Sequence, residues 1–195
     1  MPWLIILLGY LLGSVPTAWF AGHLLRRQDI RRMGDGNMGA ANAFRELGAA
    51  TGIFVGLVDA AKGALTIVLA RYAGVSQPVV MMAGGAAIFG HNFPVFLGFR
   101  GGRGESTAIG EFLVLMPYPI LLAAGPAILT LIFSRNVVIT SAVLFIPMVF
   151  ISWLIGVPGY LIAYSIILMV IVALTHFFRV RLTPIRITVK SDKNP

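Results

Sequence analysis

The stretch from Gly90 to Gly104 carries the residue types that bind an anion. It reads Gly-His-Asn-Phe-Pro-Val-Phe-Leu-Gly-Phe-Arg-Gly-Gly-Arg-Gly and contains no acidic residue. Glycines let a backbone turn its N–H groups toward one point without a Cβ clash, and Arg100 and Arg103 add positive charge beside them. Amide and guanidinium groups together suit a phosphate. The alternative is a loop at a membrane surface whose arginines only set topology, and the loop alone does not separate the two.

A second stretch, from Gly34 to Arg45, combines glycines with polar side chains in a similar way. It matches the pattern G-x-G-x-x-G, but a dinucleotide-binding fold needs a strand before that pattern, within a βαβ unit. Here an arginine-rich segment precedes it and an apolar segment follows, so we exclude a Rossmann site. What remains is a glycine turn with Asn37 and Asn42 as donors and Arg45 near a helix start, a second anion-binding element.

The composition places the chain in a bilayer. Hydrophobic residues make up 58%, charged residues 11%, and the mean hydropathy is +0.90, whereas soluble domains carry roughly 25% charged residues. The chain has no cysteine, and its three histidines are far apart in sequence, so we expect no metal site. The net charge of +8 would suit nucleic acid, but the basic residues lie between apolar segments, so we expect no nucleic-acid partner.

Apolar segments of about 20 residues predict an all-α, polytopic membrane protein with about seven transmembrane helices. No Lys or Arg precedes the first apolar run, so we expect a retained span that starts outside rather than a signal peptide. The fourth segment is short, which suits a helix packed inside the bundle. The expected spans are approximately 3–25, 47–72, 78–89, 106–116, 120–133, 137–155 and 158–178.

The distribution of basic residues predicts the orientation of these spans. Every Lys and Arg except Lys62 and Arg71 falls in segments 26–45, 100–103, 135 and 179–193. The seven-span arrangement places all four segments on one side, which the positive-inside rule makes cytoplasmic. The amino terminus is therefore expected outside and the carboxyl terminus in the cytoplasm, with both glycine loops on the cytoplasmic side.

The second expected span contains an acid and a base within the apolar run. Asp59 and Lys62 are three residues apart on a glycine-rich helix, so their side chains can pair on the face that meets other helices. We expect this to be a buried structural pair bracing two helices rather than a catalytic one.

The order of these motifs resembles one membrane family over nearly the whole chain. The motifs are Gly13-Ser14-Val15-Pro16, Gly36-Asn37-Met38-Gly39-Ala40-Ala41-Asn42, Asp59-x-x-Lys62-Gly63 and the run from Gly90 to Gly104. They resemble the bacterial acylphosphate:glycerol-3-phosphate acyltransferases, the PlsY family. The resemblance implies one transmembrane acyltransferase domain over residues 1–195, in the bacterial plasma (inner) membrane, with its active site on the cytoplasmic side.

The resemblance also implies a reaction of phospholipid biosynthesis. A fatty acyl group would pass from acyl phosphate to the 1-hydroxyl of glycerol 3-phosphate, giving lysophosphatidic acid and phosphate. Neither acyl-CoA, nor a metal, nor any other cofactor would take part. The partners would be these two substrates and the membrane lipids, together with a phosphate acyltransferase that makes the acyl phosphate.

The family's functional residues can be placed on this sequence as expectations. Arg45 and Arg103 would bind the phosphate of glycerol 3-phosphate, while Asn37 and Asn42 would shape the first loop or donate within it. Ser141 and His176 would be the catalytic residues. Ser141 falls where the family has a polar serine, and His176 would orient or deprotonate the attacking hydroxyl, unless a substrate phosphate oxygen is the base. The remaining candidates lie in the second loop: Gly101, Gly102 and Gly104 as amide donors to acyl phosphate, and His91 as either a loop brace or a substrate contact.

Four positions depart from the family pattern near the site. Asp35 stands where serine is usual, Arg103 replaces lysine, Glu105 replaces a small apolar residue, and Arg179 replaces an asparagine. The Glu-x-Lys expected near the end is also missing. A divergent, non-catalytic member of the family and a small transporter of phosphorylated solutes are therefore the competing functions. A transporter often has two related halves, and we find no repeat.

Overall fold

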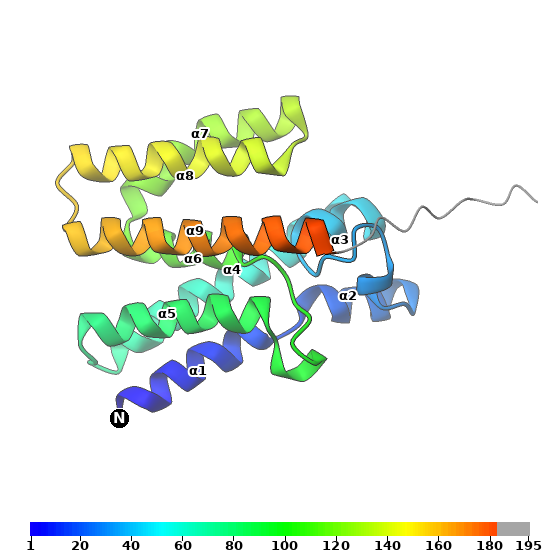
Figure 1. Ribbon diagram of the computed structural model, residues 1–195, viewed down its shortest axis with the longest axis horizontal. Helices are drawn as coiled ribbons and strands as arrows, with labels where there is room; N and C mark the ends of the chain where they lie inside the picture. The colour runs from blue at the N-terminus through cyan, green and yellow to red at the C-terminus, as the bar shows by residue number, and fades with distance from the viewer. Residues whose placement is uncertain (183–195) are drawn as a thin grey trace, which may run out of the picture.

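The chain forms a bundle of helices in a computed structural model that describes residues 1–182, with side chains through Arg179 (Figure 1). The basic tail beyond this range and the missing Glu-x-Lys lie outside the described residues. No strand occurs within the described range. The elements are α1 (Pro2–Ser14), α2 (Thr17–Arg26), η1 (Ile30–Arg32), α3 (Ala40–Leu47), α4 (Ala49–Tyr72), α5 (Gln77–Asn92), η2 (Val95–Leu97), α6 (Glu105–Leu115), α7 (Pro117–Ser134), α8 (Val137–Leu154) and α9 (Gly159–Leu182).

Among the described residues, 6 helical segments are long and apolar enough to cross a membrane. They correspond to the expected spans except the fourth, and the chain is thus a multi-pass membrane protein. The first span was predicted as one continuous helix. In the structure it consists of two helices, α1 and α2, joined at Val15 and Pro16. Val15 is extended, and Pro16 has no N–H to continue the ladder of hydrogen bonds, which explains the break.

The expected fourth span, α6, has 11 residues and a length of about 16 Å. A hydrocarbon core of about 30 Å is too thick for it to cross alone. It packs instead along α4, where a side chain on Gly110 would collide with the backbone of Ala60, and one on Gly63 with that of Thr107. The prediction of a short helix packed inside the bundle is therefore confirmed. The same helix was also counted among the transmembrane spans, and it is too short to be one by itself.

The loops with basic residues gather at one end of the bundle (Figure 1). The turn before α3, the loop between α5 and α6, the turn between α7 and α8 and the end of α9 all lie at the end opposite the amino terminus. Arg71 lies at the other end, where its Nη1 donates to the carbonyl of Val114 at 3.1 Å. The separation of charge agrees with the predicted topology, and which end is cytoplasmic remains a prediction.

Close backbone contact and a continuous apolar core hold the helices together. Gly9 and Gly13 of α1 face the carbonyls of Ala83 and Ala87 on α5 with no room for a side chain. The core is centred on residues contributed by α4, α5, α6, α8 and α9, which are Ile67, Ile88, Phe112, Met148 and Leu168. These contacts fix the helices whose ends carry the candidate site.

Candidate active site

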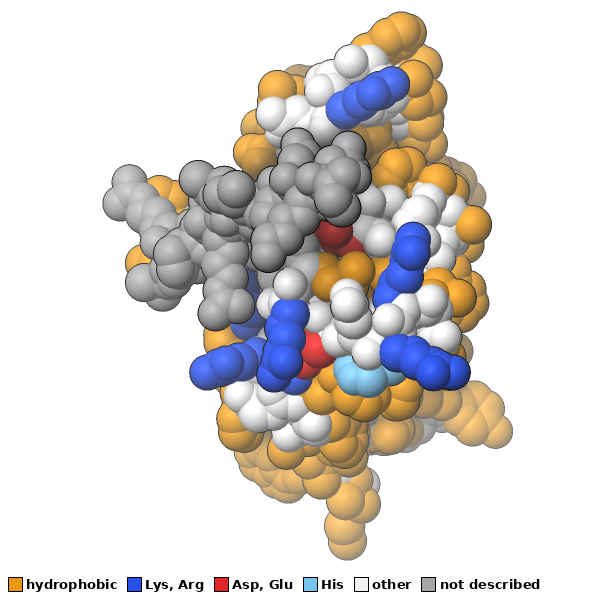
Figure 2. Space-filling view, turned by 90° about the vertical axis from the view of Figure 1, so that its right-hand side faces the viewer, with side chains coloured by type: hydrophobic (Ala, Val, Ile, Leu, Met, Phe, Trp, Pro, Cys, Tyr) orange, Lys and Arg blue, Asp and Glu red, His pale blue; other side chains and the backbone are white. Residues whose placement is uncertain are grey.

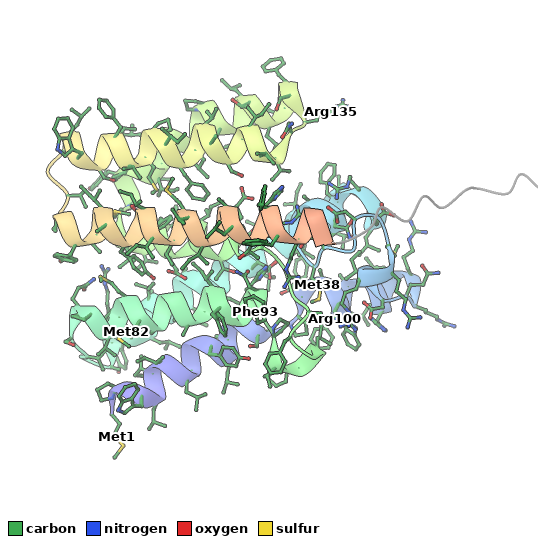
Figure 3. The ribbon with its side chains drawn as sticks, viewed as in Figure 1. Met1, Met38, Met82, Phe93, Arg100 and Arg135 are labelled. Atoms are coloured by element: carbon green, nitrogen blue, oxygen red, sulfur yellow. The ribbon has the colours of Figure 1, made fainter. Side chains whose placement is uncertain are left out.

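Basic side chains surround a smaller group of acidic and histidine side chains on the end of the bundle that carries the loops (Figure 2). Figure 3 places Met38, Phe93, Arg100 and Arg135 toward this end and Met1 and Met82 toward the other. Among the described residues, Arg26, Arg27, Arg32, Arg45, Arg100 and Arg135 expose their side chains. The end is therefore electropositive and can attract a phosphate.

The first loop is shaped from within by Asn42. This side chain is 0% exposed, and its Nδ2 donates to the carbonyls of Met33 and Asn37 at 3.1 and 2.9 Å. Its Oδ1 accepts from the N–H of Asp35 at 3.3 Å. Since Gly34 and Gly36 have φ of 53° and 71°, the chain turns tightly on either side of Asp35. Asn42 therefore shapes the first loop by bonding to its backbone, which is one of the two roles expected for this residue.

Asp35 joins the two arginines expected to bind phosphate. Its Oδ2 accepts from Arg45 Nη2 at 2.8 Å and from Arg103 Nη2 at 3.3 Å. Its Oδ1 accepts from the N–H of Asn37 at 3.0 Å. The acid that departs from the family pattern is therefore paired, and it holds both cations at one point. Arg103 Nε and Asn37 Oδ1 are buried without a hydrogen-bond partner, so polar capacity is left over beside this point.

The glycine loop differs from expectation in where its amides point. The N–H of Gly101 donates to the Asn92 carbonyl at 3.2 Å, and that of Gly102 donates to the His91 carbonyl at 2.9 Å. These two amides stabilise the loop and, being bonded to its own carbonyls, are not available to an anion. Gly104 adopts φ of 84° as the N-cap of α6, which has no side-chain cap. The amides of the first turn of α6 are the ones left for an anion.

Glu105 and Ser141 meet beside the glycine loop. Ser141 Oγ lies 2.5 Å from Glu105 Oε1 and 2.7 Å from the Val137 carbonyl oxygen. A hydroxyl has a single hydrogen, so both contacts are satisfied when Glu105 is protonated and donates to Ser141, which then donates to Val137. Burial raises the pKa of Glu105 above its usual value, and this exceeds the lowering by Ser141 and by the charge of Arg103.

We expect Glu105→Gln to weaken the dependence of stability on pH. Because the pKa of Glu105 is raised above 4.5, the folded protein holds this proton more tightly than the unfolded chain. The free energy of unfolding then falls as pH rises from 4.5 through the folded pKa, and glutamine removes this loss. Thermal unfolding in detergent, recorded at several pH values from 4.5 to neutral, measures this loss of stability. Glu46→Gln is the control, because it removes a carboxylate that does not contact Ser141. If stability changed with pH equally in the wild type, Glu105→Gln and Glu46→Gln, the expectation would be contradicted.

His176 and Arg179 lie on the last turns of α9. His176 is partly exposed and within electrostatic range of Arg103 and Asp35, so helix packing brings it close to one charged residue of each loop. Arg179 donates through Nη1 to the carbonyl of Gly101. The structure therefore gathers His176, Arg103 and Arg45 at one end, with Ser141 held by Glu105 nearby.

The pair Asp59 and Lys62 lies below this end, within the bundle. Lys62 Nζ is 2.6 Å from Asp59 Oδ1 and donates to the Val15 carbonyl at 2.6 Å, at the break between α1 and α2. Thr17 Oγ1 donates to Asp59 Oδ1 at 3.0 Å. The pair thus joins α4 to the broken first span, as a structural pair would.

His91 lies above the same pair, between it and the glycine loop. Its Nδ1 is 3.9 Å from Asp59 Oδ1, and its ring lies directly under Gly102, where a Cβ would collide with Nε2. Of the two roles left open for His91, this geometry favours bracing the loop. No group of three or more His, Cys, Asp or Glu side chains arranged for a metal occurs in the described part of the chain.

Three contacts at the site were missed from the sequence. They are the bridge from Asp35 to both arginines, the bond between Glu105 and Ser141, and the contact of Arg179 with the glycine loop. The signal in the sequence was that each contact involves a residue that departs from the expected pattern, namely Asp35, Glu105 or Arg179.

The fold and the site define a class: a polytopic α-helical membrane protein whose loop end is rich in arginine. The family model for glycerol-3-phosphate acyltransferases matches residues 3–186, and the chain belongs to that family. It is 52% identical over 181 residues to glycerol-3-phosphate acyltransferase 4 of Dehalococcoides mccartyi, covering 93% of this chain and 98% of the relative. It is 40% identical over 148 residues to glycerol-3-phosphate acyltransferase of Chlorobium luteolum, and this match covers 70% of this chain and 63% of the relative.

Solved structures of PlsY (YgiH), an integral membrane glycerol 3-phosphate acyltransferase, are similar in fold. The glycerol 3-phosphate form superposes with a TM-score of 0.81 at 27% identity, over 92% of this chain and 90% of that one. The lysophosphatidic acid form superposes with a TM-score of 0.79 at 26% identity, again over 92% of this chain and 90% of that one. These matches support the PlsY family indicated by the sequence motifs.

Proposed function

We propose that the protein transfers a fatty acyl group from acyl phosphate to the 1-hydroxyl of glycerol 3-phosphate, giving lysophosphatidic acid and inorganic phosphate. The single observation that carries this proposal is the convergence of Arg45 and Arg103 on one point at the loop end of an apolar bundle. Both substrates carry a phosphate, and one of them carries a fatty chain that the bilayer accommodates. The similar PlsY structures are described in a glycerol 3-phosphate form and a lysophosphatidic acid form, which agrees with this choice of substrate and product.

The reaction would need positioning and charge stabilisation more than covalent help from the protein. The glycerol oxygen bonds to the acyl carbon, the bond from that carbon to the phosphate oxygen breaks, and the hydroxyl proton leaves. Arg45 and Arg103 would hold the phosphate of glycerol 3-phosphate. Arg103, which has a free and buried Nε, would together with the first-turn amides of α6 also stabilise the negative charge that develops on the departing phosphate. His176 would take the proton or orient the hydroxyl, and a phosphate oxygen is the alternative base.

The protein would act as one acyltransferase domain in the bacterial inner membrane. Its basic end would face the cytoplasm, where a phosphate acyltransferase supplies acyl phosphate and glycerol 3-phosphate is available. The segregation of arginines to this end supports the orientation.

Phosphate release by the purified protein in lipid nanodiscs tests the proposal. With palmitoyl phosphate present, release should depend on glycerol 3-phosphate and should be matched by lysophosphatidic acid. Palmitoyl-CoA in place of palmitoyl phosphate should give no product. Absence of release with several acyl phosphates would refute the proposal, and counterflow of labelled glycerol 3-phosphate without product would show transport instead.

A further inference from the structure

Arg179 connects the last helix to the glycine loop through two backbone carbonyls. Its Nη1 donates to Gly101 O, and its Nη2 donates to Asn92 O at 2.5 Å. The guanidinium carbon also lies 5.7 Å from the centroid of the Phe93 ring, a cation–π distance. One turn earlier on α9, Thr175 Oγ1 accepts from Asn92 Nδ2 at 3.3 Å. Two side chains spaced four apart on one face of α9 therefore hold the end of α5 and the loop.

The contact with Gly101 fixes the orientation of a particular peptide group. In a trans peptide the carbonyl of one residue and the N–H of the next point in opposite directions. The Gly101 carbonyl is held by Arg179, and the N–H of Gly102 is held by the His91 carbonyl at 2.9 Å. This peptide group cannot rotate without breaking both bonds. Arg103 follows directly, so the direction in which its side chain leaves the loop depends on this anchoring.

The second carbonyl is anchored in the same way. Asn92 O accepts from Arg179 and also from the N–H of Gly101 at 3.2 Å, while the N–H of Phe93 donates to Phe89 O at 2.8 Å. A glycine-rich loop has many accessible conformations, so such anchors determine which of them is populated. An arginine is suited to the task because its planar fork offers donors to two acceptors at once, which neither asparagine nor lysine does equally.

His176 lies three residues before Arg179 on the same helix. Any rotation of α9 about its axis, or any shift of the loop, would move His176 relative to Arg103. The contact between Arg179 and the loop opposes both movements. It thereby connects the candidate base on α9 with the candidate phosphate ligand on the loop.

We propose that Arg179 is a positioning residue that latches the glycine loop to α9 and so holds Arg103 and His176 toward one substrate. The substrate in this statement rests on the proposed function, whereas the latch does not. It gives a structural role to an arginine where the sequence pattern led us to expect asparagine.

Hydrogen exchange of the full chain in nanodiscs tests the latch without any assumption about activity. Arg179→Ala should accelerate exchange in peptides that cover residues 92–104 by about tenfold or more, since two charge-assisted hydrogen bonds are lost. Arg179→Lys keeps the charge but not the fork and should give a smaller acceleration. Arg135→Ala removes an exposed cation at the same end of the bundle and should change nothing. Unchanged exchange in Arg179→Ala would overturn the proposal, as would wild-type exchange in Arg179→Lys.

Kinetics separate the positioning role from a general loss of structure. For Arg179→Ala we expect kcat to fall by about tenfold or more, with a smaller change in the KM for glycerol 3-phosphate, and methylguanidinium to restore part of the lost rate and slow the exchange. A fall in kcat that methylguanidinium restores without slowing the exchange would overturn the latch. If the wild-type protein releases no phosphate, the proposed function fails, and the exchange measurements still decide for or against the latch.

Discussion

Arg103→Ala should lower kcat/KM for glycerol 3-phosphate and palmitoyl phosphate by about 10²–10³-fold, the loss typical of one donor that stabilises developing negative charge. The Arg103 side chain is 15% exposed, contacts Asp35 through one nitrogen and keeps a buried, unpartnered Nε. It therefore has donors to give to a phosphate in a place from which water is largely excluded, where each such bond has its greatest effect.

The neighbouring Arg100 provides a matched control for this prediction. It lies three residues earlier in the same loop but is exposed, and Figure 3 labels it at the same end of the bundle. Arg100→Ala should retain turnover close to that of the wild type, and Arg103→Lys should lose less than alanine because the charge remains. Initial rates of phosphate release measure all three. Wild-type turnover by a folded Arg103→Ala protein would exclude this arginine from the reaction.

Lys62→Met should destabilise the protein by about 3–5 kcal/mol, because it leaves the Asp59 carboxylate buried without its counter-charge. The side chains of Lys62 and Asp59 are 8% and 2% exposed, and Asp59 Oδ2 already lacks a partner. Lys62 also caps the Val15 carbonyl at the break in the first span, so that acceptor would lose its donor as well. Thermal unfolding in a mild detergent should show a corresponding fall in Tm.

The double variant Lys62→Met with Asp59→Leu tests the cause. Removing both charges should restore a large part of the lost stability, since the cost comes from an unpaired buried charge. Arg71→Met is the control, because it removes an exposed cation, with its one hydrogen bond to the Val114 carbonyl, from the carboxyl end of the same helix. Equal unfolding temperatures for Lys62→Met and the wild type would show that the pair does not hold α4 to the first span.

The positions of the helices and the segregation of charge followed from the sequence. Both depend on local properties: a run of apolar residues long enough to cross a bilayer, and Lys or Arg in the segments between runs. The spacing of Asp59 and Lys62 also predicted their pairing, because three residues along a helix bring two side chains to one face. Local spacing did not reveal the break at Pro16, although proline was a warning. The shortness of the fourth segment, by contrast, was already visible in the sequence, and α6 is a short helix packed against α4.

The site depended on information that no local pattern contains. Asp35 and Arg103 are 68 residues apart, Ser141 and Glu105 are 36 apart, and Arg179 and Gly101 are 78 apart. Whether such residues touch depends on how each helix is rotated and how far it is shifted along its neighbour, which packing of the whole bundle decides. The same holds for the amides of Gly101 and Gly102, since glycine permits an inward N–H but does not require it.

The sequence by itself thus determined that this is a membrane bundle of the glycerol-3-phosphate acyltransferase family with two basic, glycine-containing loops at one end. Only the tertiary structure decided that Asp35 draws Arg45 and Arg103 together, that Glu105 binds Ser141, and that Arg179 anchors the loop beside His176. Hydropathy and charge act along the chain, whereas the rotations and shifts that bring distant polar groups into contact are set by close packing between helices.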